Sequence, residues 1–288
     1  MATAAHWLEG ARPRTLPAAI APVAAGTGAA ALDSGFVAWK AALALSVALA
    51  LQVGVNYAND YSDGVRGTDA DRVGPLRLVG SGAARPVVVR NAALASFAVA
   101  GVAGLALALT TAWWLLLVGA SCVLAAWFYT GGTRPYGYRG LGEVSVFVFF
   151  GLVAVIGTTF VQAETVTAVS VLAGVGCGAL ACALLVANNL RDLETDRVAG
   201  KHTLAVRLGD RRTRWFYTAL LVAAFIALGA IGTLHRPAVA VLVTALPAVR
   251  CARTVLEGAR GRDLVPVLKM TGSVLLLYGV LLGAALSL

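Results

Sequence analysis

The sequence predicts an all-α, polytopic membrane protein. Three observations lead to this class: a shortage of charged residues, recurrent apolar segments of membrane-spanning length, and basic residues gathered on one side of those segments. Of the 288 residues, 59% are hydrophobic and 13% are charged, whereas charged residues make up about 25% of a typical soluble domain. A soluble protein of this size would need far more charge on its surface.

Long apolar segments recur along the whole chain and indicate about nine transmembrane helices, each of roughly the 20 residues that cross the hydrocarbon layer. The last segment is the least regular, because Arg262, Asp263 and Lys269 crowd its start. The predicted spans are residues 15–33, 36–56, 92–110, 112–129, 143–162, 167–187, 216–234, 237–255 and 268–287.

The distribution of basic residues predicts the orientation. All of the 23 lysines and arginines except Lys40 and Arg236 fall on the same side of these spans as the N-terminus. Because cytoplasmic loops are enriched in lysine and arginine, we expect the N-terminus inside and the C-terminus outside, in the plasma membrane. We expect one membrane domain, 1–288, with cytoplasmic cap loops at about 57–91, 130–142 and 188–215. The net charge of +9 suits anionic lipid headgroups and does not imply nucleic acid.

Two polar segments follow apolar spans on the predicted cytoplasmic side. The first is NYANDYSDGVRGTDADRVGPLR (56–77), and the second is NNLRDLETDRVAGKHTLAVRLG (188–209). Residues spaced by four share one face of a helix. The residues at this spacing are Asn56 and Asp60, Asn59 and Asp63, and Asn188, Asp192 and Asp196; Asp69 and Asp71 follow later in the first segment.

The two acidic arrays predict a metal site that binds a diphosphate. Like charges at this spacing repel each other, so Asp192 and Asp196 require a cation nearby. Paired oxygen ligands suit Mg²⁺, which binds one or two carboxylates together with substrate phosphates and water. Guanidinium and ammonium groups in the same loops match phosphate oxygens; they belong to Arg72, Arg77, Arg134, Arg191, Arg197, Lys201 and Arg207. A charged head beside apolar helices favours a polyprenyl diphosphate as substrate.

At these positions the sequence resembles the UbiA superfamily of membrane aromatic prenyltransferases. It is most similar to the branch that prenylates 1,4-dihydroxy-2-naphthoate in menaquinone synthesis. The resemblance covers nearly the whole chain and is carried by ARPRTLPAAIAPV (11–23), YTGGTRPYGYRGLGEVSVFVFFGLVAVIGTTFVQ (129–162) and the two polar segments. It implies helices around a central cavity, and transfer of a polyprenyl group to the naphthoate with loss of diphosphate and CO₂, giving demethylmenaquinone.

The family motifs then suggest roles for individual residues. The second motif corresponds to Asp192 and Asp196. The first corresponds to Asn59, Asp60 and Asp63, but Gly67 stands at its last position, and Asp69 is the equivalent in the naphthoate branch. The implied Mg²⁺ ligands are Asn59, Asp60, Asp63, Asp69, Asn188, Asp192 and Asp196, of which Asp63, Asp69, Asp192 and Asp196 are the implied catalytic residues.

Further residues are expected to bind the two substrates. A lysine four residues after Tyr129 is typical of the family, but here Thr133 stands there, and Arg134 is the nearest cation. Diphosphate binding is expected from Arg72, Arg134, Arg191 and Lys201. The expected pocket for the acceptor and the allyl cation comprises Gln52, Asn56, Tyr129, Tyr136 and Tyr138. For Glu143, at the start of a predicted span, stabilisation of the helix start is favoured.

Three alternatives remain at this point. A prenyltransferase of the same superfamily with a 4-hydroxybenzoate-type acceptor has the same motifs. A CDP-alcohol phosphotransferase requires DGxxAR, whereas the chain reads DGVRGT from Asp63. A transporter would couple acidic groups to ions near the membrane midplane, whereas both arrays here lie at the same membrane boundary, which favours an enzyme.

Overall fold

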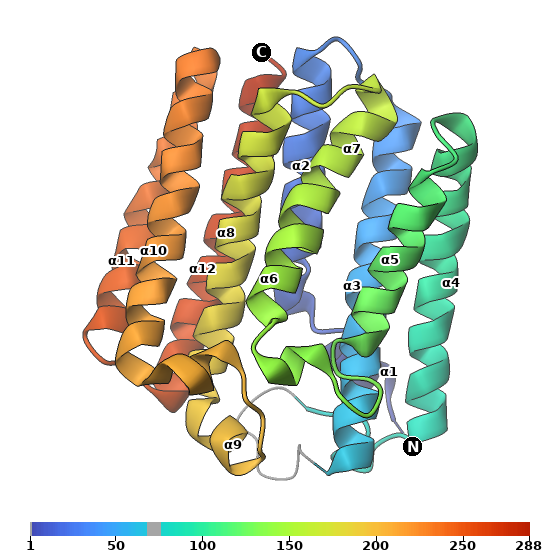
Figure 1. The fold of residues 1–288 in the computed structure, drawn as a ribbon, viewed down its shortest axis with the longest axis vertical. Coiled ribbons are helices and arrows are strands. Elements are labelled where there is room, and N and C mark those ends of the chain that lie inside the picture. The colour runs from blue at the N-terminus through green and yellow to red at the C-terminus, as the bar shows by residue number, and fades with distance from the viewer. Residues whose placement is uncertain (1, 68–75) are drawn as a thin grey trace.

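A computed structural model describes residues 2–67 and 76–288, and these residues form helices and no strand (Figure 1). In hydrocarbon, every backbone N–H and C=O group must be hydrogen-bonded within the protein, and a helix satisfies this requirement within one segment. The all-α prediction is therefore confirmed. Asp69, Asp71 and Arg72 lie outside the described residues.

The nine predicted spans each overlap a helical segment. In chain order these are α2 (Pro17–Leu32), α3 (Ala38–Arg66), α4 (Pro86–Thr110), α5 (Leu115–Phe128), the continuous run of α6 (Gly142–Val146), π-helix η3 (Phe147–Val153) and α7 (Ala154–Ala163), then α8 (Ala168–Arg191), α10 (Leu204–Leu234), the run of η4 (Arg236–Thr244) and α11 (Ala245–Leu256), and α12 (Leu264–Leu286). The short helices are α1 (Ala4–Gly10), η1 (Pro13–Thr15), η2 (Tyr136–Arg139), α9 (Leu193–Val198) and η5 (Gly261–Asp263).

The number of membrane crossings is only partly established by these helices. Within the described residues, seven helices are long and apolar enough to cross a bilayer, or eight if the pair Ala4–Thr15 and Pro17–Leu32, bent by 50°, counts as one span. The apolar helix α5 has 14 residues and is shorter. Nine crossings therefore stay a prediction. The N- and C-termini lie at opposite ends of the bundle, as an odd number of crossings requires (Figure 1).

The predicted cap loops 57–91 and 188–215 are partly helical. Helix α3 continues to Arg66, and α10 already begins at Leu204. The apolar pattern marks where the hydrocarbon ends, whereas a helix continues for as long as its backbone hydrogen bonds do. The first acidic array consequently lies on the last turns of α3, which hold its side chains more rigidly than a loop would.

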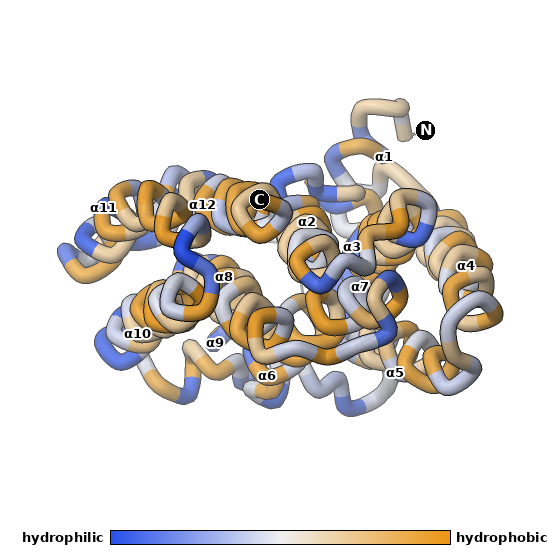
Figure 2. The backbone as a smooth tube through the Cα atoms, turned by 90° about the horizontal axis from the view of Figure 1, so that it is seen from above, coloured by the Kyte–Doolittle hydropathy of each residue, from blue (hydrophilic) through white to orange (hydrophobic). Residues whose placement is uncertain are grey.

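Close contact between α2 and α12 joins the two ends of the chain. A Cβ added at Gly28 would lie 2.3 Å from the carbonyl oxygen of Gly283, so only glycine permits this approach. Small residues at helix interfaces are the usual means of close packing in membranes. Seen along the bundle axis, α12 and α2 lie next to each other, and α8 lies between α10 and α6 (Figure 2). Among the candidate spans of the described residues, α8 is the most buried, and 72% of its apolar 18-residue stretch lies inside the protein.

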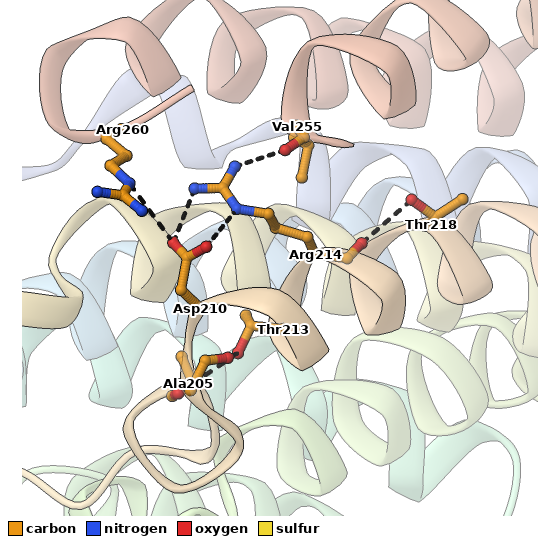
Figure 3. Close-up of polar contacts among 8 residues, drawn as sticks. Ala205, Asp210, Thr213, Arg214, Thr218, Val255 and Arg260 are labelled. Carbon is orange, nitrogen blue, oxygen red and sulfur yellow. Dashed lines mark hydrogen bonds and ion pairs between the residues drawn. The ribbon is translucent and has the colours of Figure 1, made fainter. Parts of the chain in front are cut away.

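A buried arginine links α10 to α11 at the end of the bundle that also holds α9. Gly209 has a non-helical backbone inside α10 (φ 76°), and Asp210 follows it. The Arg214 guanidinium donates two hydrogen bonds to the Asp210 carboxylate, at 2.7 and 2.8 Å, and a third to the Val255 carbonyl (Figure 3). The Nε of Arg260 lies 3.9 Å from the same carboxylate. This network connects α10, α11 and the following loop.

Candidate active site

Two acidic arrays lie at the same end of the bundle, one on the last turns of α3 and one at the junction of α8 and α9 (Figure 1). The connection from α5 to α6, which includes η2, lies at this end as well. The site is therefore built from three segments that are far apart in the sequence. Hydrogen bonds and ion pairs join the three segments, as the following contacts show.

Asp63 is the centre of these contacts. Its side chain is 4% exposed, and its Oδ2 lies 3.6 Å from Nζ of Lys201, which is 6% exposed. The hydroxyl of Tyr138, on η2, donates to Asp63 Oδ1. The Lys201 ammonium also lies 4.8 Å from the centroid of the Tyr138 ring, a distance typical of a cation–π contact. An acid, a cation and an aromatic face thus meet at one point.

The second array keeps the predicted helical spacing. The backbone N–H of Asp192 donates to Asn188 O, and that of Asp196 donates to Asp192 O, at 3.1 and 2.8 Å. The Asp192 carboxylate accepts two hydrogen bonds from Arg191, both at 2.7 Å. The backbone N–H of Lys201 donates to Asp196 O at 2.9 Å. Because the ammonium of the same lysine reaches Asp63, Lys201 connects the two arrays.

Asn59 and Arg66 tie α3 to the segment that follows α5. The Thr130 hydroxyl donates to Asn59 Oδ1 at 2.7 Å. The Arg66 guanidinium donates to the carbonyls of Thr130 and Gly132, and it lies 5.6 Å from the centroid of the Tyr138 ring. Sequence reasoning missed Arg66 and Thr130. Arg66 follows Asp63 by three residues, so its helical spacing was a usable signal; Thr130 offered none.

The other pair on α3, Asn56 and Asp60, lies on a neighbouring face of the same helix. Both oxygens of the Asp60 carboxylate accept backbone N–H groups, from Leu78 at 2.8 Å and from Val79 at 2.9 Å. Asp60 is 1% exposed, and Leu78 is fully buried. Asp60 therefore holds the chain after the first polar segment onto α3. Both oxygens of its carboxylate are thus bound by backbone N–H groups.

Gln52 and Asn56, predicted to line the acceptor pocket, form hydrogen bonds to the N-terminal segment. The amide of each donates to the Thr15 hydroxyl at 3.0 Å, and Asn56 also donates to Ala11 O. The Thr15 hydroxyl in turn donates to Arg12 O at 2.9 Å. Thr15 was not singled out from the sequence. These contacts hold the bend between α1 and α2 against α3.

Tyr129 and Tyr136 pack edge to face beside the acids, with ring centroids 5.5 Å apart. A phenol ordinarily ionises at about pH 10. Burial raises the pKa of Tyr136, whose hydroxyl bonds to Ala125 O and to the Ser145 hydroxyl. Both phenols are therefore neutral at physiological pH, and their rings can face a cation.

The remaining predicted cations are placed differently. Arg191 lies on Asp192 and Lys201 on Asp63, so both stand beside the acids. Arg134 is exposed in the connection before η2. Among the described residues, it forms no ion pair. Asp69 and Arg72 fall in the stretch that the structure does not describe, so their placement stays a prediction.

The donor set fits a metal ion that is shared with substrate. Asn59, Asp63, Asp192 and Asp196 supply the amide and carboxylate oxygens that Mg²⁺ prefers. Within residues 2–67 and 76–288, no three His, Cys, Asp or Glu side chains form a group that would hold a metal alone. Mg²⁺ usually completes such a donor set with substrate phosphate oxygens and water.

Comparison with known proteins agrees with this architecture. The chain is 56% identical to the 1,4-dihydroxy-2-naphthoate octaprenyltransferase of Mycobacterium tuberculosis over 287 residues, which is 100% of this chain and 98% of the relative. The Escherichia coli protein of the same name is 42% identical over 229 residues, 77% of this chain and 74% of that protein.

Solved structures share the fold. A UbiA homologue from Archaeoglobus fulgidus bound to DMAPP and Mg²⁺ superimposes with a TM-score of 0.71 at 16% identity, covering 98% of this chain and 99% of that one. An apo UbiA homologue from Aeropyrum pernix gives 0.72 at 17% identity, covering 93% and 96%. The model of the UbiA prenyltransferase family matches residues 19–265. This chain therefore belongs to the UbiA prenyltransferase family.

Proposed function

We propose that this protein is a Mg²⁺-dependent 1,4-dihydroxy-2-naphthoate polyprenyltransferase. It transfers the polyprenyl group of a polyprenyl diphosphate to the naphthoate, and diphosphate and CO₂ leave, giving demethylmenaquinone in its quinol state. The observation that carries the proposal is 56% identity over the whole chain to a protein named for this reaction. The meeting of both acidic arrays at Lys201 supports it, since a diphosphate needs acids and cations at one point.

Asn59, Asp63, Asn188, Asp192 and Asp196 would hold the metal. When bound, Mg²⁺ supplies positive charge that stabilises the departing diphosphate. Asp60 was expected among the ligands, but its two bonds to backbone N–H groups favour a role in anchoring the chain. Asp69 remains a proposed ligand and catalytic residue on the basis of the family resemblance alone.

Cationic side chains would bind the diphosphate from the protein side. Lys201 and Arg191 already lie on acids of the site, so they stand where phosphate oxygens would be. Arg134 and Arg72 are proposed to complete the set. Fixed donors at the position where charge develops on the leaving group stabilise the transition state.

The tyrosines would stabilise the allyl cation that forms when the prenyl C–O bond breaks. Tyr138 offers its ring to Lys201, which shows that this face accepts a cation. Tyr129 and Tyr136 lie next to it as neutral phenols. Exclusion of water by the surrounding apolar helices would prevent hydrolysis of the cation. The direct contacts of Gln52 and Asn56 favour support of α1 and α2 over contact with the acceptor.

We place the site on the cytoplasmic side of the plasma membrane. In the sequence, all lysines and arginines except Lys40 and Arg236 fall on the same side of the predicted spans as the N-terminus and the acidic arrays. Such a bias is typical of the cytoplasmic face. Both substrates would then reach the site from that side, the naphthoate from water and the prenyl tail from lipid.

Purified protein incubated with radiolabelled octaprenyl diphosphate, the naphthoate and Mg²⁺ tests the proposal. We expect a lipid-soluble product whose mass corresponds to octaprenyl demethylmenaquinol or its quinone. Addition of 4-hydroxybenzoate in competition tests the second acceptor, and preferential prenylation of the benzoate would assign the chain to that alternative. If correctly folded wild-type protein forms no prenylated product with either acceptor, both prenyltransferase assignments are refuted and a transporter is favoured.

A further inference from the structure

Glu143 is a buried carboxylate beside the site, and stabilisation of the helix start does not account for its surroundings. It lies in the first turn of α6 and is 4% exposed. Its Oε1 accepts a hydrogen bond from Asn189 Nδ2 at 3.0 Å. In the part of the chain that the structure describes, no lysine or arginine forms an ion pair with it. Acidic groups within membrane spans are candidates for function by default.

Glu143 borders both the aspartates and the tyrosines. Its partner Asn189 directly follows Asn188, a proposed ligand. The Tyr129 hydroxyl packs against the neighbouring residue, since a Cβ added at Gly142 would lie 2.9 Å from its oxygen. The charges of Glu143, Asp63 and Asp196 all act on Tyr129. Glu143 therefore lies close to Tyr129 and to the end of α8 that carries Asn188.

The backbone around Glu143 is held firmly. The Cys182 thiol donates to the Glu143 carbonyl at 3.0 Å, so α8 contacts both the main chain and the side chain of this residue. Stabilisation of a helix start requires neither burial nor a side-chain partner on another helix. A carboxylate that is fixed by an amide and forms no ion pair with the described cations is suited to accept a proton or a hydrogen bond.

We propose that Glu143 binds the ring hydroxyl of the aromatic acceptor and takes its proton as the ring attacks the prenyl group; this inference rests on the function proposed above. The hydroxyl proton passes to the Glu143 carboxylate. The bond between the prenyl carbon and the diphosphate oxygen breaks first, and the adjacent ring carbon, which carries the acceptor's carboxylate, then forms a bond to the prenyl carbon. The product of this step is a β-keto acid.

Loss of CO₂ then returns an electron pair to the ring oxygen, which recovers the proton from Glu143. The carboxylate is regenerated, and no oxidant or reductant is needed. Of the other acids, Asp63 lies beside Lys201 and Asp192 accepts two bonds from Arg191. A cation beside a carboxylate weakens it as a base. No described lysine or arginine pairs with Glu143 in this way.

Kinetics of Glu143→Gln test the proposal. We expect kcat for prenylation of the naphthoate to fall by about 100-fold or more, the range for removal of a general base. The KM for the prenyl diphosphate and the half-saturating Mg²⁺ concentration should stay within about twofold of wild type, because the metal site is untouched. Glu143→Asp, which keeps the carboxylate, should recover part of kcat.

A pH profile separates this chemical role from a structural one. As pH rises, the acceptor hydroxyl ionises without help, so the ratio of wild-type to Gln-variant activity should decrease. Among the described residues, the titratable groups near Glu143 and its neighbour Tyr129 include Tyr136, Cys182, Asp63 and Asp196, and they are the same in both proteins. Asp210→Asn, which breaks the ion pairs with Arg214 and Arg260 (Figure 3), is the control for loss of a carboxylate elsewhere.

Wild-type kcat in Glu143→Gln, or a loss that is constant across pH and matched by Asp210→Asn, would overturn the proposal. If the Gln variant fails to fold, the Asp variant with its pH profile decides instead: unchanged kcat and profile would contradict the proposal. Inactive wild-type protein would refute the proposed function, whereas active wild type with an unaffected Gln variant refutes only the role of Glu143.

Discussion

The ammonium group of Lys201 lies 3.6 Å from the Asp63 carboxylate, and both side chains are almost completely buried. The backbone N–H of the same lysine donates to Asp196 O. One residue therefore connects Asp63 on α3 with the backbone of α9, the helix that carries Asp196. Since it also lies over the Tyr138 ring, its charge is placed where the head of the substrate and the allyl cation would meet.

Lys201→Gln should weaken binding of the prenyl diphosphate. A hydrogen bond to a charged group contributes about 1.5–3 kcal/mol, so we expect the KM for this substrate to rise by about tenfold or more. The control is Arg197→Gln, because Arg197 belongs to the same segment but pairs with Glu194 on the surface. Equal effects of the two substitutions on KM would show that general charge, and not the position of Lys201, matters.

Asp63→Asn and Asp60→Asn should have different consequences. Loss of the Asp63 charge should raise the half-saturating Mg²⁺ concentration and reduce product formation by about 100-fold, the order found for loss of a preorganised electrostatic group. Loss of the Asp60 charge weakens two bonds to buried backbone N–H groups, so we expect the free energy of unfolding to fall by about 1–3 kcal/mol. Mg²⁺ titration and thermal melting in detergent measure the two effects. A Mg²⁺ shift in Asp60→Asn as large as that in Asp63→Asn would instead make Asp60 a ligand.

Thr15→Val should destabilise the contact between the N-terminal segment and α3. The threonine hydroxyl is the common acceptor of the Gln52 and Asn56 amides, and its loss leaves buried donors unsatisfied. We expect a cost of about 1–3 kcal/mol, visible as a lower midpoint of thermal unfolding. Thr15→Ser keeps the hydroxyl and serves as the matched control. An unchanged midpoint for the valine variant would show that water replaces the lost acceptor.

Gly28→Val should disrupt the contact between α2 and α12. The new Cβ would overlap the Gly283 carbonyl, which is backbone and cannot rotate away. We expect a loss of monodisperse protein in size-exclusion chromatography of the detergent-solubilised sample. Gly101→Ala is the control, since a Cβ there has no neighbour within 4 Å, and it should be neutral or slightly stabilising. Normal behaviour of Gly28→Val would mean that the two helices can separate without loss of the fold.

The composition and the apolar spacing were sufficient to predict the class of the protein, its helices and the end of the bundle at which the acids lie. These properties follow from local chemistry, since hydrocarbon admits helices and excludes charge. The four-residue spacing of Asn188, Asp192 and Asp196 also survives in the structure, because backbone hydrogen bonds continue through the junction of α8 and α9.

Which Asn/Asp pair on α3 anchors the chain and which belongs to the site depended on contacts between distant parts of the chain. Asn56 with Asp60 and Asn59 with Asp63 have the same chemistry and the same spacing, and they lie on neighbouring faces of one helix. Only the packing of Thr15 and Leu78 against the first pair, and of Tyr138 and Lys201 against the second, distinguishes an anchor from a site. Glu143 acquired its partner in the same way, from a helix that follows it in the sequence. Helical periodicity places a side chain on a face, but the group that the face meets is set by the fold.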